Sequence, residues 1–142
     1  MKQLLAILLI ATSLLANKQI YCLAEAIYFE SRGSSLADQA AVADVILNRV
    51  ESSRYPDTIC KVVHQYKQFS YYWDGKSDRM LDLDAKASAT LLAVQVAKFG
   101  RFRGISEGSL FYHASYINPY WAKAYQLVGT IGQHKYYRIS KD

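Results

Sequence analysis

The sequence predicts an α+β fold in which helices dominate and a small antiparallel sheet follows late in the chain. Three segments within the first hundred residues place apolar side chains at helical spacings of three and four. After residue 108, short apolar segments lie next to glycine, asparagine or proline, as strands often do. The chain has 142 residues and no internal repeat or low-complexity linker. We therefore expect one domain behind a short leader.

The first predicted helix of the domain covers Cys22–Ser31. Gly33 follows it and supplies the left-handed turn with which many helices end. Four residues of the helix share one face because they recur at spacings of three and four: Leu23, Ala26, Ile27 and Glu30. The helix therefore carries one carboxyl group, that of Glu30, on its apolar side.

A second helix is predicted over Leu36–Val50. Ser34 or Ser35 caps its N-terminus, and Ser35 with Asp38 three residues later is similar to a capping box. This cap places the start of the helix shortly after Gly33.

The middle of the chain contains a break, a loop and a third helix. Pro56 precedes a short apolar stretch at Ile59–Val63. Gln65–Met80 is polar and aromatic without a clear period, which predicts a long surface loop, and such loops are often functional. A third helix is expected over Asp84–Phe99, ended by Gly100.

The last third of the chain supplies the sheet. Gly108 leads into an apolar segment, Ser109–His113, which we expect to be a strand. Asn118-Pro119 turns the chain, and Ile131–Ile139 is predicted to be a final strand.

The N-terminus carries a compartment signal. Met1-Lys2 is a short positive region, and the apolar run after it is shorter than the roughly 20 residues of a membrane-spanning helix. Residues 1–16 are therefore predicted to be a secretory signal peptide cleaved after Ala16. Leu14 fits the cleavage pattern poorly, so an uncleaved N-terminal signal anchor is the alternative. Both predict export to the periplasm or the medium.

The two cysteines, Cys22 and Cys60, are most simply paired in an oxidising compartment. Their disulfide would close a loop worth about 4 kcal/mol in the chain-entropy model. A lipidated Cys22 and a lone catalytic thiol are the less favoured alternatives.

The composition limits the classes of binding partner but identifies no single one. The formal charge of +5 favours anionic surfaces. No long run of lysine and arginine indicates nucleic-acid binding. The twelve tyrosines suit both sugar binding and core packing.

Glu30 is the candidate catalytic residue. Burial on an apolar helix face raises a carboxyl pKa and keeps the group protonated near neutral pH, the state that a general acid requires. The structural alternative is an ion pair with Arg32 or Arg49.

Seven ordered blocks resemble the cell wall hydrolase family of the bacterial spore cortex-lytic enzymes. They cover nearly everything after the leader, and it is their order that makes the resemblance specific. The blocks are Cys22–Gly33, Gln39–Val50, Tyr55–Val63, Gln68–Ser70, Leu110–His113, Pro119–Trp121 and Ile131–Tyr137.

The resemblance implies a helix-rich, lysozyme-like catalytic domain over residues 17–142, acting on peptidoglycan. The glutamate of the family's Tyr-x-Glu-x-Arg-Gly motif falls on Glu30 and is implied to be the catalytic acid. Many members carry a second acid directly after Arg-Gly, where this chain has Ser34. The expected reaction is therefore cleavage between N-acetylmuramic acid and N-acetylglucosamine by a single-glutamate lytic transglycosylase. The compact chain with its leader resembles short members from phages, as in an endolysin, and from Gram-negative bacteria.

Further site residues are expected around Glu30. Gln68 and Ser70 are candidates for polar contacts to sugar, with Phe69 packed between them, or else they fix a loop end. Tyr112 and Trp121 are predicted to flank a glycan cleft, although burial of Tyr112 is a rival. Asn48 and Arg49 are expected to support the site.

Three other functions remain open at this stage. A muramidase-type hydrolase would need a second carboxylate, for which Glu25 points away from Glu30, while Asp74 and Asp78 lie in the long loop. A zinc amidase or endopeptidase would use His64, His113 or His134, but no close ligand spacing is present. A non-catalytic wall-binding module is the third. We expect no metal or other cofactor, membrane contact only through the N-terminal segment, and a monomer.

Overall fold

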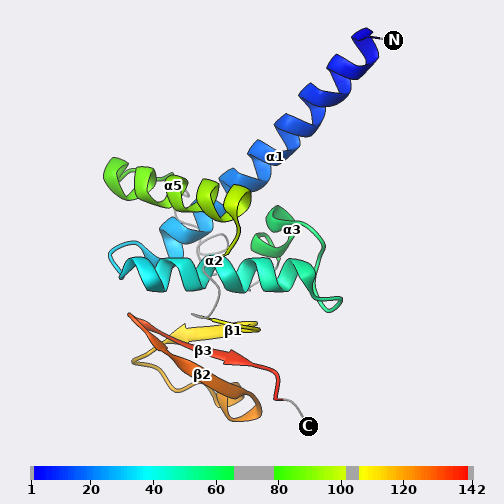
Figure 1. Cartoon of the computed structure of the whole chain (residues 1–142). Coiled ribbons are helices and arrows are strands. Elements are labelled where there is room, and N and C mark those ends of the chain that lie inside the picture. The colour runs from blue at the N-terminus through cyan, green and yellow to red at the C-terminus, as the bar shows by residue number, and fades with distance from the viewer. Residues whose placement is uncertain (1, 66–78, 102–105, 141–142) are drawn as a thin grey trace.

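The computed structural model describes residues 2–65, 79–101 and 106–140, with side chains from residue 16 onward. Helix α2 lies in the middle of the molecule, with the sheet on one side and α1, α3 and α5 on the other (Figure 1). This arrangement confirms the predicted α+β class. The elements are α1 (Lys2–Ser31), α2 (Leu36–Glu51), α3 (Ile59–Val63), α5 (Leu83–Phe99), β1 (Phe111–Ala114), the 3₁₀ helix η1 (Tyr120–Ala124), β2 (Gln126–Ile131) and β3 (His134–Arg138).

Helix α1 supplies the centre of the core. Leu23, Ala26 and Ile27 are fully buried, as the spacing predicted, and α1 contacts α2, α3 and α5. The expected start at Cys22 was wrong, because the helix continues from Lys2 without a break. Within the described part of the chain, no helix combines the length and hydropathy of a membrane span.

The capping predictions for α2 and α5 are confirmed. The Ser35 hydroxyl accepts a hydrogen bond from the Asp38 backbone N–H at 3.2 Å. The Asp38 carboxylate, however, accepts hydrogen bonds from the sheet, as described below. Helix α5 begins one residue before the predicted start, with Asp82 as its cap, and ends at Gly100.

A disulfide joins Cys22 in α1 to Cys60 in α3, as predicted from the sequence. The sulfur atoms are 2.12 Å apart, and 38 positions separate the two residues. This bond fixes α3 against the helix that carries Glu30.

The sheet is antiparallel with the strand order β1-β3-β2. The predicted strand Ser109–His113 is shifted to Phe111–Ala114. The prediction of one strand over Ile131–Ile139 was wrong, because Ile131 ends β2 and His134 begins β3. Strand β2 was missed since most of its side chains are exposed and an irregularity between Leu127 and Gly129 breaks its alternation.

The hairpin turn between β2 and β3 lies against the N-terminus of α2. Gly132 has a φ of +55°, a conformation that side-chain-bearing residues rarely adopt. A Cβ atom at this position would lie 2.7 Å from Ser34 Oγ and 2.8 Å from Asp38 Cβ. Only glycine therefore lets the hairpin approach α2 this closely.

We expect Gly132→Ala to destabilise the fold by about 1–3 kcal/mol, because it adds both backbone strain and a clash. Gly129→Ala is the matched control, since nothing lies within 4 Å of its added Cβ. Urea unfolding of both variants measures the difference. Equal stabilities would contradict the close approach.

Candidate active site

Glu30 lies in the last turn of α1, partly exposed. Burial of its carboxyl group raises its pKa above the ordinary value. A hydrogen bond with the Tyr112 side chain and electrostatic interactions with His134 and Arg49 lower this pKa, but burial outweighs them. The group is therefore held towards its protonated form, as a general acid requires.

The side chains around Glu30 come from three elements. Tyr112 extends from β1, His134 from β3 and Arg49 from α2. The desolvated Tyr112 hydroxyl lies beside the Glu30 carboxyl group, and both facts raise the tyrosine pKa well above its usual range. Since the Tyr112 hydroxyl keeps its proton, it can donate to a Glu30 carboxylate.

The sequence left two arginines as structural partners for Glu30. Arg32 instead donates a hydrogen bond to the Tyr28 hydroxyl, with its guanidinium 4.6 Å from the centre of that ring. Arg49 is buried, and its Nε donates to the Leu110 carbonyl at 2.8 Å. Arg49 thus interacts electrostatically with Glu30 while being held by the residue that precedes β1. It assists the carboxylate form without reversing the effect of burial.

Asp38 is a second carboxylate close to this site, in the opposite electrostatic state. Its side chain is fully buried, which opposes ionisation, but hydrogen bonds from His134, Ser34 and Tyr136 outweigh that effect and lower its pKa. The Tyr136 hydroxyl donates to Oδ1 at 2.7 Å, and His134 Nδ1 lies 2.8 Å from Oδ2. The Gln133 backbone N–H also donates to Oδ2, at 3.3 Å.

The two predicted aromatic residues lie on different faces of the sheet. Tyr112 faces the helices, where its ring lies 5.1 Å from that of His134. Trp121 packs against His113 at 5.5 Å and against Tyr137 at 5.6 Å. Tyr112 and His113 are neighbours in β1, so their side chains point to opposite faces of the sheet. The structure therefore brings Tyr112 to Glu30 and places Trp121, which packs on His113, in a separate aromatic cluster.

The remaining candidates are only partly described. Asn48 donates a hydrogen bond to the Ser109 carbonyl at 2.9 Å, so it holds the segment before β1. Five candidates lie outside the described residues: Gln68, Phe69, Ser70, Asp74 and Asp78. Within the described ranges, no group of three or more histidine, cysteine or acidic residues is placed to bind a metal ion.

Sequence reasoning missed the importance of Asp38, His134 and Tyr136. His134 and Tyr136 follow Asp38 by 96 and 98 positions, so no local spacing relates them. The only signal was Asp38 in the capping position, which explains a short polar side chain there without indicating its distant partners.

The chain is similar to known proteins both in sequence and in fold. Residues 33–137, more than half of the chain, match the family described as Cell Wall Hydrolase. The chain belongs to the cell wall hydrolase family. Glu30 lies three positions before the matched segment, so the match itself assigns no role to this residue.

Curated relatives of this cell wall hydrolase are spore cortex-lytic enzymes. The chain is 41% identical over 61 residues to the one from Bacillus cereus and 38% identical over 61 residues to the one from Bacillus subtilis. Each match covers 43% of this chain, but only 24% and 20% of the respective relative. The chain thus aligns with about a quarter of their length or less.

Two solved structures share the fold. One is described as the catalytic domain of the germination-specific lytic transglycosylase SleB from Bacillus anthracis, with a TM-score of 0.68 and 28% identity. That match covers 84% of this chain and 93% of the other. The catalytic domain of the Bacillus cereus SleB protein gives a TM-score of 0.68 and 26% identity, covering 86% and 91%. The helix-rich domain with a small sheet is therefore the fold of these catalytic domains.

We expect Tyr112→Phe to raise the pKa of Glu30 further, because the lost hydrogen bond favours the carboxylate form. Tyr137→Phe is the control, since that hydroxyl contacts His113 on the other face of the sheet. Carbon-detected NMR titration of the Glu30 carboxyl group measures both. An unchanged or lower pKa in Tyr112→Phe would refute the assigned contact.

We expect Asp38→Asn to lower stability by about 3–5 kcal/mol at neutral pH, because it breaks a buried hydrogen-bonded pair. The pKa of Asp38 is lowered in the folded state, so its contribution is present above the unfolded value and lost as pH falls through the folded one. Urea unfolding between roughly pH 2 and pH 7 should therefore show a flatter acid limb in the variant. The exposed Asp57→Asn serves as control, and identical acid limbs in Asp38→Asn and the native chain would disprove the role of Asp38.

Proposed function

We propose that this chain cleaves peptidoglycan glycan strands between N-acetylmuramic acid and N-acetylglucosamine, as a lytic transglycosylase with Glu30 as its catalytic acid. The observation that carries the proposal is the environment of Glu30. Burial keeps its proton, while Tyr112, Arg49 and His134 favour the carboxylate that remains after the proton leaves. Membership of the cell wall hydrolase family and the likeness to a catalytic domain named as a lytic transglycosylase support the reaction class.

The first step is protonation of the bond to be broken. Glu30 donates its proton to the glycosidic oxygen as the bond to the muramic acid C1 breaks, and an oxocarbenium-like centre forms. The C6 hydroxyl of the same muramic acid then attacks C1. The Glu30 carboxylate takes the hydroxyl proton, which yields a 1,6-anhydro end and restores the acid.

The site suits an acid that alternates between two protonation states. A carboxylate newly formed in a desolvated site is costly unless donors and cations face it. Tyr112 supplies the donor, and Arg49 is held in place by the Leu110 carbonyl. The same residue can therefore act as acid in one step and as base in the next.

Among the described residues, the placement of Asp38 and Glu25 favours transglycosylation over hydrolysis. Asp38 has both oxygens engaged by side chains and backbone, so it is not available to activate water. Glu25 lies five positions before Glu30, about 140° away around the helix. A muramidase-type hydrolase would need such a second carboxylate several ångströms from the first.

The predicted leader and the Cys22–Cys60 disulfide support a site of action outside the cytoplasm. The wall substrate lies in the same oxidising surroundings in which that disulfide is stable. We propose the periplasm or the medium, with residues 1–16 as signal peptide or anchor and residues 17–142 as the catalytic domain. The polar loop residues Gln68 and Ser70, with Phe69, are proposed to contact the glycan.

We expect Glu30→Gln to lower the rate of glycan cleavage by roughly 10²–10⁴-fold, because the amide has no proton to give. Glu25→Gln, on the same helix, is the matched control. Turbidity loss of purified sacculi measures the rate, and mass spectrometry of soluble products shows whether the ends are anhydro or reducing. Since burial raises the pKa of Glu30, activity should decline as pH rises through that value.

Other outcomes favour other functions. Cleavage unchanged in Glu30→Gln would overturn the acid assignment. Reducing ends in place of anhydro ends would indicate a hydrolase. Chelator-sensitive release of stem peptides would indicate a zinc amidase or endopeptidase, and wall binding without cleavage by the native chain would indicate a binding module.

A further inference from the structure

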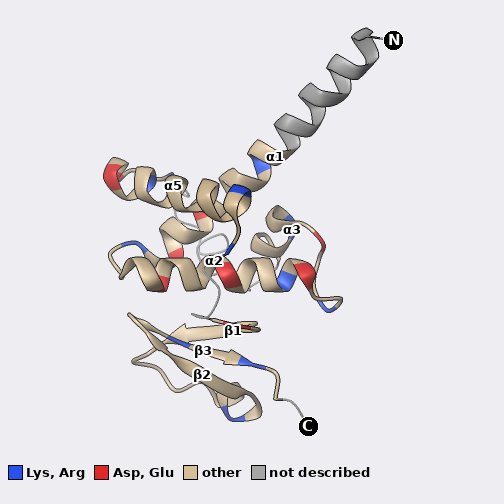
Figure 2. Cartoon of the chain, viewed as in Figure 1, with Lys and Arg blue, Asp and Glu red and all other residues tan. Residues whose placement is uncertain are grey.

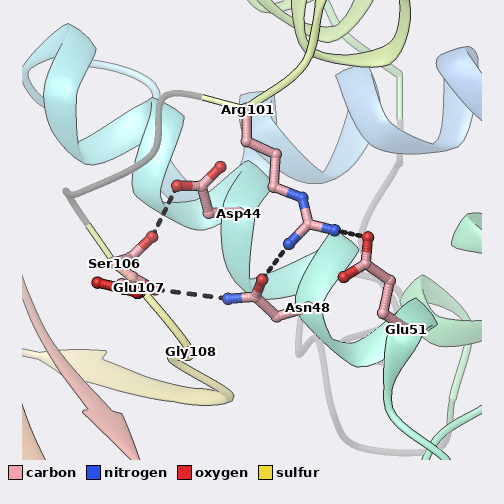
Figure 3. Close-up of a pocket in the computed structure, with 7 residues that line it drawn as sticks. All are labelled: Asp44, Asn48, Glu51, Arg101, Ser106, Glu107 and Gly108. Atoms are coloured by element: carbon pink, nitrogen blue, oxygen red, sulfur yellow. Dashed lines mark hydrogen bonds and ion pairs between the residues drawn. The ribbon is translucent and has the colours of Figure 1, made fainter.

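A polar pocket with a volume of about 520 Å³ lies beside α2. Asp44, Asn48 and Glu51 line it from the helix, and Arg101 and residues 106–108 close it from the other side (Figure 3). The three helix positions recur at spacings of four and three, so they share one face. Arg49, which serves Glu30, lies five positions after Asp44 and hence about 140° around the helix. The pocket is therefore separate from the surroundings of Glu30.

Asp44 is the buried group of this pocket, with only 3% of its side chain exposed. Its Oδ2 accepts a hydrogen bond from the Ser106 hydroxyl at 2.9 Å. Its Oδ1 has no hydrogen-bond partner among the described residues. Burial raises the pKa of Asp44, while Ser106 and Arg101 only partly offset that effect. A buried carboxylate oxygen that lacks a donor is costly, and a ligand with N–H groups would relieve that cost.

The one cation of the described lining is already engaged. Arg101 donates hydrogen bonds to the side chains of Asn48 and Glu51, as the dashed lines in Figure 3 show. The described lining thus holds three acidic side chains, those of Asp44, Glu51 and Glu107, for one cation. In Figure 2, by contrast, η1 and β3 carry lysine and arginine but no acidic residue. An acidic pocket thus lies within a chain of net positive charge.

The lining also restricts the kind of ligand. None of its described residues is aromatic, so the pocket offers no ring on which a sugar could stack. A primary ammonium group is compact and has three N–H donors, which suits a polar site with a buried carboxylate acceptor. Its charge also complements the acidic side chains of Asp44 and Glu107.

We propose that this pocket binds a primary ammonium group of the peptidoglycan substrate, with Asp44 as its acceptor and Glu107 as the second carboxylate. The inference rests on the proposed function, because the substrate supplies the ammonium group. Two sources share this chemistry: the free side-chain amine of a diamino acid in the stem peptide, and the amine of a glucosamine that has lost its acetyl group. The pocket then selects wall segments by their free amines at a distance from Glu30.

The first experiment compares cleavage of native sacculi with cleavage of sacculi whose amines have been acetylated. Acetylation should lower kcat/KM of the native chain about tenfold, mainly through KM, because a charged hydrogen bond is lost. Asp44→Asn should lower kcat/KM on native sacculi by a similar factor and should respond little to acetylation. The exposed Asp57→Asn is the matched control and should behave as the native chain does.

A binding measurement separates this inference from the proposed reaction. Sedimentation of Glu30→Gln with intact sacculi needs no cleavage, and acetylation should weaken its binding about tenfold. Adding Asp44→Asn to that variant should remove the difference. An effect of acetylation on binding without one on cleavage would count against the proposed function. Equal binding to native and acetylated sacculi would overturn the pocket assignment.

Further measurements identify the bound amine and check the variants. Glycan strands stripped of stem peptides, with and without chemical de-N-acetylation, show which amine is bound. Thermal unfolding verifies that Asp44→Asn is folded, and Glu107→Gln, exposed on the surface, provides a second variant that should reduce the acetylation effect. An undiminished acetylation effect in both variants would refute the proposal.

Discussion

The hydrogen bonds of the Asp38 carboxylate hold the sheet against the helices. The carboxylate is fully buried near the start of α2, and its oxygens accept from Tyr136 and from the hairpin backbone at Gln133. These bonds can form only because Gly132 has no side chain, which lets the turn approach α2 closely. A single ionised group thus determines where β3 lies, and β3 in turn positions β1 through an antiparallel ladder.

The position of the sheet decides the chemistry of Glu30. Tyr112 and His134 reach this carboxyl group from β1 and β3, while α1 supplies the carboxyl group itself. Two acidic residues on neighbouring helices therefore have opposite properties. Asp38 is surrounded by donors and stays ionised, whereas Glu30 is desolvated and tends to keep its proton. The first holds the structure together, and the second is free to exchange a proton with a substrate.

The sequence predicted those parts of the fold that depend on local spacing. The buried face of α1, the Ser35 cap and the end of α5 at Gly100 all follow from residues within a few positions of one another. The pairing of the two cysteines also needed only their number and the compartment. Strand β2 did not follow from its sequence, because its exposed side chains and irregular pairing leave no clear alternation.

The candidate site was only partly predictable, because local spacing reveals Glu30 but not the residues that tertiary structure brings to it. Glu30 was found because it is an acid on an apolar helix face and because the glutamate of the family's Tyr-x-Glu-x-Arg-Gly motif falls on it. Its neighbours Tyr112 and His134 reach it only through tertiary structure, so their relation to it could not be read from spacing. Trp121 shows the reverse case, since its position beside a turn gave no information about the face of the sheet that it covers.

The disulfide between α1 and α3 makes the stability of the fold depend on whether Cys22 and Cys60 are oxidised or reduced. With Cys22 and Cys60 as thiols, the unfolded chain regains the freedom of a loop of 38 positions, worth about 4 kcal/mol in the chain-entropy model. That free energy corresponds to roughly a thousandfold change in the ratio of folded to unfolded molecules. The fold that carries Glu30 is therefore more stable in oxidising surroundings, where Cys22 and Cys60 are joined, than in reducing ones.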